Sequence, residues 1–366
     1  MNEEIGYEAA RTAKVAGRAE GNLEDQLRVA MELIRGLQII VSAKPEDAAE
    51  RGQLTALEAE LKAVLQSFAD AILKGERSLV EASTENRELA FNHLVSFLMS
   101  FASRTGTRER LQIFTTNYDR YIEAGADVAG LRLIDRFVGY LAPVFRASRL
   151  DIDLHYNPPG IRGEPRYLEG VARFTKLHGS VDWLDADRTI RRIGLPFGAS
   201  ETGSFLSATG LADADARRLM IYPNAAKDRE TTSYPYVELF RDLAAAICRP
   251  NSTLVCYGYG FGDEHINRVI EDMLAIPSAH LVIIAYDDPL GRIMQTYRRL
   301  GRQAQTTLMI GDHLGDLVAL VENYLPKPAI DRTTIRMAEL LKARWSAGPR
   351  SEGIEDQVSD DIEPVI

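Results

Sequence analysis

Three short segments carry polar residues that simple turns rarely need, and each follows an apolar run. They are Thr-Thr-Asn-Tyr-Asp at 115–119, Lys-Leu-His-Gly-Ser at 176–180, and a glycine-rich segment at 257–267. An Asn amide both donates and accepts hydrogen bonds, and His is the side chain best suited to proton transfer near neutral pH. Asn117 and His178 are therefore the first candidates for chemistry.

Each segment also has a plainer interpretation when it is taken alone. Asn117 and Asp119 could cap a following helix. A single His followed by Gly is more often structural than catalytic. Glycines at 258, 260 and 262 allow a ligand to approach the backbone ahead of a helix N-terminus, but their spacing departs from the usual dinucleotide fingerprint. The three segments carry weight only together.

Short apolar runs of strand length alternate with helical patterns from residue 111 onward. The predicted strands cover residues 111–114, 174–177, 219–222, 253–257, 281–286 and 307–310, and helical patterns cover 237–247 and 317–325. Strands that alternate with helices indicate a parallel sheet, and ligands bind beyond the carboxyl ends of its strands. The three segments lie at such ends. We therefore predict an α/β fold with a Rossmann-like parallel sheet flanked by helices.

Residues 1–105 are predicted to form a helical region, because apolar residues recur there with a period near 3.6. The pattern is clear at 23–37 and 54–72, and a further helix is expected near Thr84, which would cap it. The apolar stripes exceed what one sheet edge covers, so a homo-oligomer is expected. The Rossmann-type domain is predicted at 106–328, a C-terminal helix at 329–347 and a disordered acidic tail at 348–366.

The composition excludes several classes of protein. A formal net charge of −10 argues against strong nucleic-acid binding, since phosphate neutralisation needs clustered Lys and Arg. Cys248 and Cys256 are the only cysteines; they cannot supply four zinc thiolates, and no metal is expected. No apolar run reaches the ~20 residues that cross a bilayer, and the N-terminus has no signal-peptide pattern. A cytoplasmic protein without membrane contact is expected.

Taken in order, Thr-Thr-Asn-Tyr-Asp, Leu-His-Gly-Ser and Gly-Tyr-Gly-Phe-Gly-Asp-x-His-Ile-Asn resemble the sirtuin-like domains of bacterial anti-phage NAD hydrolases. The resemblance covers about residues 111–325. It implies that Asn117 and His178 are the catalytic pair. It also implies that the first segment binds the substrate NAD through Thr115, Thr116 and Asp119. The third segment is implied to contact the adenosine half of NAD, through Gly258, Tyr259, Phe261, Asp263 and Asn267.

The implied reaction is the hydrolysis of NAD to nicotinamide and ADP-ribose by a defence effector that depletes cellular NAD. In size the chain is similar to the sirtuin-like subunit that pairs with a HerA-type ATPase, which adds that ATPase to the expected partners. A sirtuin deacylase is disfavoured, because its structural zinc needs cysteines that this sequence does not have. A catalytically inert subunit that binds NAD or ADP-ribose is the alternative from another class.

The start of the chain departs from the family pattern. Family members normally begin with an apolar strand and Gly-Ala-Gly-x-Ser, whose glycines cradle the NAD phosphates, whereas this chain opens with Met-Asn-Glu-Glu-Ile-Gly. Three explanations are open: a late start, a segment supplied by a partner or a rearranged N-terminus, and loss of activity.

Overall fold

The computed structural model describes residues 3–15, 21, 23–44, 46–102, 110–148, 153–156, 166–168, 170–186, 189–202, 205 and 234–326. The chain divides into two units, Met1–Pro328 and Ala329–Ile366, and every described residue belongs to the first. The strand predicted at 219–222, the helix at 329–347 and the acidic tail at 348–366 lie outside the described residues.

In the described part of the N-terminal region, the chain forms four helices: α1 (Glu3–Val15), α2 (Leu23–Ala43), α3 (Ala48–Val80) and α4 (Thr84–Ala102). The prediction of an N-terminal helical region is confirmed. Helix α3 is longer than predicted, because Asp47 caps it by accepting from the amides of Ala49 and Glu50. The cap predicted for α4 was wrong by one residue. The Ser83 hydroxyl accepts from the Asn86 amide, and Thr84 is already helical.

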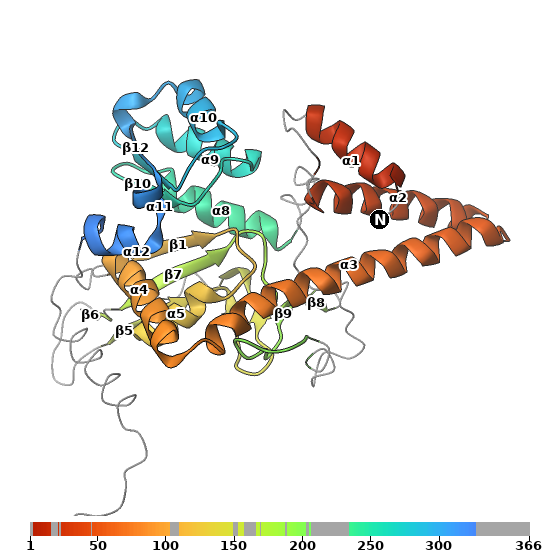
Figure 1. The fold of residues 1–366 in the computed structure, drawn as a ribbon, viewed down its shortest axis with the longest axis horizontal. Helices are drawn as coiled ribbons and strands as arrows, with labels where there is room; N and C mark the ends of the chain where they lie inside the picture. Colours follow the sequence, from red (N-terminus) through yellow and green to blue (C-terminus); the bar gives the residue numbers. More distant parts are fainter. Residues whose placement is uncertain are drawn as a thin grey trace, which may run out of the picture. The chain divides into compact units, whose positions relative to one another are not determined.

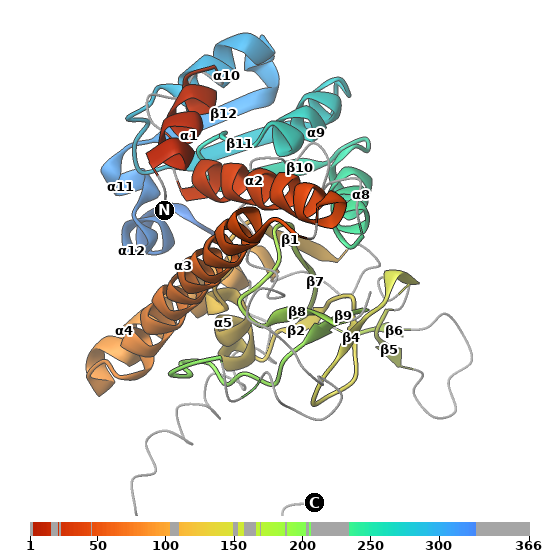
Figure 2. The same ribbon diagram turned by 90° about the vertical axis from the view of Figure 1, so that its right-hand side faces the viewer.

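Helix α3 connects two hydrophobic cores. Its first half places Leu57, Leu61 and Leu65 in a cluster with residues of α1 and α2. Its second half places Ala69 and Leu73 in a cluster with chain segments that follow β7. Figures 1 and 2 show α3 as the long helix that leads from the N-terminal helices to α4. This one helix therefore joins the helical region to the part of the domain that carries His178.

Among the described residues, six parallel strands form two three-stranded sheets. The first has the order β1 (Leu111–Thr115), β7 (Val171–Lys176), β2 (Arg132–Ile134), and the second has the order β10 (Thr253–Tyr257), β11 (His280–Ala285), β12 (Thr306–Ile310). The helices of this part are α5 (Tyr121–Ala129), α8 (Tyr236–Ile247), α9 (Glu264–Leu274), α10 (Arg292–Leu300), α11 (Asp312–Gly315) and α12 (Leu317–Ala319). The chain has the predicted α/β, Rossmann-like fold with parallel strands flanked by helices.

Two elements of the α/β part differ from the prediction by more than a one-residue shift of an end. Strand β7 begins at Val171, three residues before the predicted start. The prediction stopped at the half-exposed Arg173, which interrupts an apolar run that continues on its other side through the buried Ala172. The strand ends at Lys176, so Leu177 starts the turn that carries His178. The helix predicted at 317–325 is divided into α12 and a π-helical turn, η4 (Leu320–Tyr324).

The two sheets each have one open edge. Among the described residues, β1 pairs only with β7 and β10 only with β11. Every residue of β1 is half-exposed, whereas those of β7 are nearly all buried. Helix α4 covers both edge strands: the ring centroid of Phe97 lies 5.2 Å from that of Tyr257, and Phe97 also packs in the cluster around Leu111.

A small antiparallel sheet, which the sequence did not predict, lies beside the larger ones. It has the order β3 (Phe137–Val138), β4 (Val144–Phe145), β9 (Thr189–Arg192), β8 (Trp183–Ala186), and a separate pair joins β5 (His155–Tyr156) to β6 (Arg166–Tyr167). Phe137, Phe145 and Trp183 pack ring against ring at its centre. Strands of two to four residues are too short for a recognisable alternation. Since β8 follows β7 closely, this sheet anchors the turn that carries His178.

Candidate functional site

The first and second segments follow adjacent parallel strands. Thr115 and Lys176, the last residues of β1 and β7, are register partners. The Lys176 ammonium is buried; it donates to the backbone carbonyl of Asp119 and lies 3.1 Å from a carboxylate oxygen of Glu123. The backbone carbonyl of Tyr118 accepts from the Val181 amide at 3.0 Å. These contacts fix the two loops against each other.

Asn117 is exposed at the end of β1. Its backbone amide donates to the Thr115 hydroxyl at 3.1 Å, while its side chain makes no hydrogen bond in the part of the chain described. The capping interpretation therefore does not hold for Asn117. Asp119 does take a helix-start role, because its carboxylate accepts from the Tyr121 amide at 3.3 Å. The Asn117 amide group remains available to a ligand.

A buried ion pair attaches the first segment to helix α3. Arg120 donates to the Glu76 carboxylate of α3, with 2.6 Å between Nη2 and Oε2, and the two side chains are 7% and 0% exposed. The Arg120 backbone amide also donates to Glu76, and its guanidinium donates to the carbonyls of Leu195 and Pro196. A buried polar network whose hydrogen bonds are satisfied rigidifies the segments that it joins. Helix α3 thus holds the loop of Asn117 in place.

His178 links the second segment to the third. Its Nε2 lies 2.8 Å from Oδ2 of Asp263, and the two side chains are 12% and 5% exposed. Asp263 is the N-cap of α9, since its Oδ1 accepts from the His265 amide at 3.0 Å. The ring centroid of Tyr118 lies 6.4 Å from that of His178. The structure therefore brings all three segments together at the carboxyl ends of β1, β7 and β10.

The third segment has an open backbone and an internally bonded set of side chains. Gly258 has a φ of +66°, and a Cβ added to Gly258 or Gly260 would meet nothing within 4 Å. The Tyr259 hydroxyl, in contrast, contacts the Asp263 carbonyl at 3.0 Å and Oδ1 of Asn267 at 2.9 Å. Burial, and then the charge of Asp263, raise the pKa of Tyr259, so this hydroxyl stays protonated. The glycines leave room for a ligand, while the side chains support the loop.

A model of the SIR2-like domain matches residues 111–307. The match covers more than half of the 366 residues and contains all three segments. The chain belongs to the SIR2-like family. Since SIR2-like domains are often NAD-dependent enzymes, membership indicates an activity that involves NAD. No curated protein matches the chain.

The sequence did not reveal three contacts of this SIR2-like domain. They are the pairing of His178 with Asp263, the buried Lys176 and the Glu76–Arg120 pair. A usable signal was present for one of them: an Asp after a glycine-rich turn and before a helix is a strong N-cap candidate, so its carboxylate is held in a fixed place. The other two join residues too far apart in sequence for spacing to show.

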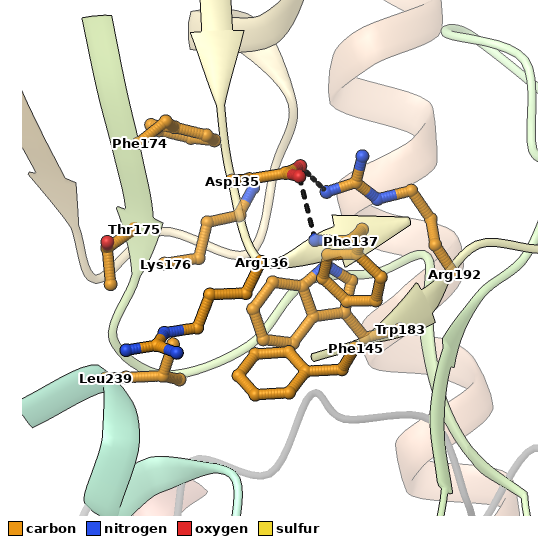
Figure 3. A pocket seen from close by; sticks show the side chains of 10 residues that line it. All are labelled: Asp135, Arg136, Phe137, Phe145, Phe174, Thr175, Lys176, Trp183, Arg192 and Leu239. Atoms are coloured by element: carbon orange, nitrogen blue, oxygen red, sulfur yellow. Dashed lines mark hydrogen bonds and ion pairs between the residues drawn. The ribbon is translucent and has the colours of Figure 1, made fainter. Parts of the chain in front are cut away.

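A small cavity lies beside the SIR2-like site without including it. Figure 3 shows its lining, in which Asp135 accepts from Arg192 and from the Phe137 amide. Trp183 contributes an indole N–H without a partner in the described structure. The lining residues include Lys176 but not Asn117, His178 or Asp263. The cavity is part of the packing between the small sheet and β7.

The two cysteines of the SIR2-like chain lie after a helix and within a strand. Cys248 follows α8, and Cys256 lies on β10. Both are free thiols. Burial raises the pKa of Cys256 to about 12. In the described part of the chain, no three His, Cys, Asp or Glu side chains are grouped to hold a metal ion, and no helix is long and apolar enough to cross a membrane.

Proposed function

We propose that this SIR2-like chain hydrolyses NAD to nicotinamide and ADP-ribose, with Asn117 and His178 at the reacting ribose. The observation that carries the proposal is the convergence of the three segments through the Lys176, Tyr118 and His178 contacts. An exposed amide and a half-buried imidazole there supply the two groups that the reaction needs. Family membership supports NAD as the substrate.

The chemistry fits these residue types. The bond between C1′ of the ribose and the pyridinium nitrogen breaks, and its electron pair leaves with neutral nicotinamide. A water oxygen then bonds to C1′, and the proton of that water passes to His178. Asn117 can donate to or accept from a ribose hydroxyl and so orient the sugar. The pyridinium already carries positive charge, so the leaving group needs no separate acid.

We further propose that Thr115, Thr116 and Gly258 line the nucleotide site. They lie at the ends of β1 and β10, and the open space beside Gly258 and Gly260 supports a close backbone approach.

A defence role, with NAD depletion as its outcome and a HerA-type ATPase as partner, is part of the proposal and rests on the family resemblance. A sirtuin deacylase is less well supported. The whole sequence has two cysteines, fewer than the four thiolates of its zinc module, and an aromatic cluster forms the core of the small sheet. The alternative of an inert NAD-binding subunit is distinguished by the experiment that follows.

The test is product analysis by liquid chromatography and mass spectrometry. Purified chain is incubated with NAD, with and without an acetyl-lysine peptide, and with and without the product of the neighbouring gene. We expect equimolar nicotinamide and ADP-ribose without peptide. Release that requires the peptide and yields acetylated ADP-ribose would identify a deacylase. NAD binding without release in every arm would identify an inert subunit.

A further inference from the structure

The pairing of His178 with Asp263 fixes the direction of one hydrogen bond. A neutral imidazole has one N–H donor and one acceptor nitrogen, whereas an ionised carboxylate only accepts. Oδ1 of Asp263 already accepts from the His265 amide, and Oδ2 lies 2.8 Å from Nε2 of His178. With both oxygens accepting, Nε2 carries the proton. The acceptor nitrogen of His178 is then Nδ1.

We propose that Asp263 is a positioning residue, which holds His178 in the tautomer with its proton on Nε2 and leaves Nδ1 to accept the proton of the attacking water. This inference rests on the proposed NAD hydrolysis and assigns Asp263 a role through His178 rather than through the nucleotide. The burial of both side chains keeps water from competing for the bond.

The rest of the third segment supports Asp263. The Tyr259 hydroxyl bonds to the Asp263 backbone carbonyl and to Oδ1 of Asn267. The Asn267 amide in turn donates to the Phe261 carbonyl at 3.1 Å. Phe261 is buried and has a φ of +53°, a conformation that few residues other than Gly adopt and that surrounding contacts must hold. These contacts hold the carboxylate of Asp263 in a fixed position.

This assignment differs from the one that the family resemblance implies, in which the same side chains contact the adenosine half of NAD. Polar atoms of Tyr259, Asn267 and Asp263 are already bonded within the protein. If they serve His178, their loss reduces turnover and leaves nucleotide affinity nearly unchanged. If they contact adenosine, their loss weakens binding first. The two roles are therefore separable by kcat and by the Kd for ADP-ribose.

Asp263→Asn separates the two roles most clearly, because the N-cap of α9 fixes the orientation of the new side-chain amide. The Asn oxygen must accept from the His265 amide, so the NH2 group faces His178 and donates to Nε2. The imidazole proton then moves to Nδ1, where it blocks proton acceptance. Loss of the orienting carboxylate costs about 10⁴-fold in kcat in the serine proteases. We expect a loss of at least about 10²-fold here.

The experiment combines long-range ¹H–¹⁵N spectra of the full chain with kinetics. The His178 signals are assigned by their disappearance in His178→Ala. We expect the Nε2–H tautomer in the native chain and the Nδ1–H tautomer in Asp263→Asn. The kcat should fall at least about 10²-fold, with the Kd for ADP-ribose within about threefold of native. Glu264→Gln removes the same charge one residue away, on an exposed side chain, and should change neither quantity.

An Nδ1–H tautomer in the native chain would overturn the proposal, as would Asp263→Asn with native kcat or with its main loss in ADP-ribose affinity. The native spectrum needs no turnover, so a chain that fails to cleave NAD refutes the proposed function without deciding the tautomer. If Asp263→Asn does not fold, Asp263→Ser keeps a capping oxygen and removes the partner of His178. It should then show both tautomers and a reduced kcat.

Discussion

Asn117 and His178 differ in how the protein holds them. The Asn117 side chain is exposed and makes no hydrogen bond within the described fold. His178 is mostly buried and bonded to Asp263. An exposed polar side chain without such a bond, in the loop that follows a parallel strand, is a candidate for ligand contact. The two residues should therefore respond differently to truncation: Asn117 in activity alone, His178 in both activity and stability.

Cys256 provides a residue-scale test of the environment of β10. Both cysteines are half-buried, and desolvation raises the pKa of both thiols, that of Cys256 to about 12. The thiolate of Cys256, which is the reactive form, is therefore scarce at pH 8. We expect iodoacetamide to label Cys248 before Cys256 in the folded chain, as followed by peptide mass spectrometry. Both should react in urea. Equal labelling without urea would contradict the larger pKa shift of Cys256.

The raised pKa of Cys256 also determines how its contribution to the free energy of unfolding changes with pH. The folded chain holds the Cys256 proton more tightly than the unfolded chain, whose thiol has the ordinary pKa of 9.0. The contribution of this thiol to the free energy of unfolding therefore falls as the pH rises from 9.0 towards 12.

The site residues show what sequence reasoning can reach. The three segments were recognisable because strand ends, glycines and helix starts are local patterns. The sequence also placed them at one sheet edge, since parallel strands share it. The Asp263–His178 bond could not be foreseen, because it joins two loops whose approach depends on packing between strands. Nor could a charged residue such as Lys176 be recognised as buried, since its partners are a backbone carbonyl and a distant carboxylate.

At the scale of elements, α3 is the main connection between the helical region and the site. The Glu76–Arg120 pair is its chemical anchor, and the Ala69–Leu73 cluster its apolar one. A buried charge that loses its partner is costly, because it cannot regain its hydration.

Glu76→Ala should therefore lower the free energy of unfolding by about 3–5 kcal/mol, since Arg120 would be left charged in a buried place. Urea unfolding followed by circular dichroism measures this loss. Glu88→Ala, on an exposed face of α4, is the matched control and should stay within about 0.5 kcal/mol of native. A Glu76→Ala midpoint equal to that of the control would show that α3 does not depend on the pair.

The open edges of β1 and β10 predict fast amide exchange at the backbone groups that face away from β7 and β11. Thr115 accepts from the Leu177 amide of the segment after β7, so Gln112 and Phe114 direct their backbone groups to the open side. Gly258 donates to Ile284 of β11, so Val255 and Tyr257 face away from β11. Amide exchange measured by NMR should be at least about tenfold faster at these four residues than at their sequence neighbours. Equal protection would show that another segment already pairs there.

For the whole molecule, the helical region is the best candidate surface for assembly. Helices α1 and α2 cover most of the apolar stripe predicted on α3. Less apolar surface is therefore left for a second subunit than the sequence analysis expected. Among the described residues, Tyr7, Ile39 and Ile40 stay exposed at 74%, 64% and 43%. The fold class and the helical region could be predicted from periodicity, whereas the coverage of α3 could not, because it depends on how three helices cross.

We expect the purified chain to form a homo-oligomer through this remaining surface. Light scattering at micromolar concentration should give a mass that is a multiple of 40.7 kDa. Replacement of Tyr7 and Ile39 by Lys should shift the mass towards the monomer. The same replacement at Tyr140, which is 99% exposed on the β3–β4 connection, is the control. A native mass of 40.7 kDa would refute the oligomer.

The initial rate of nicotinamide release from NAD shows whether Asn117 and His178 take part in NAD cleavage. Native chain, Asn117→Ala, His178→Ala and the control His280→Ala, at the amino end of β11, are compared after thermal unfolding shows that each is folded. We expect release by the native chain and the control, and a loss of at least about 10²-fold in both site variants. Native-like release by folded His178→Ala would contradict this expectation.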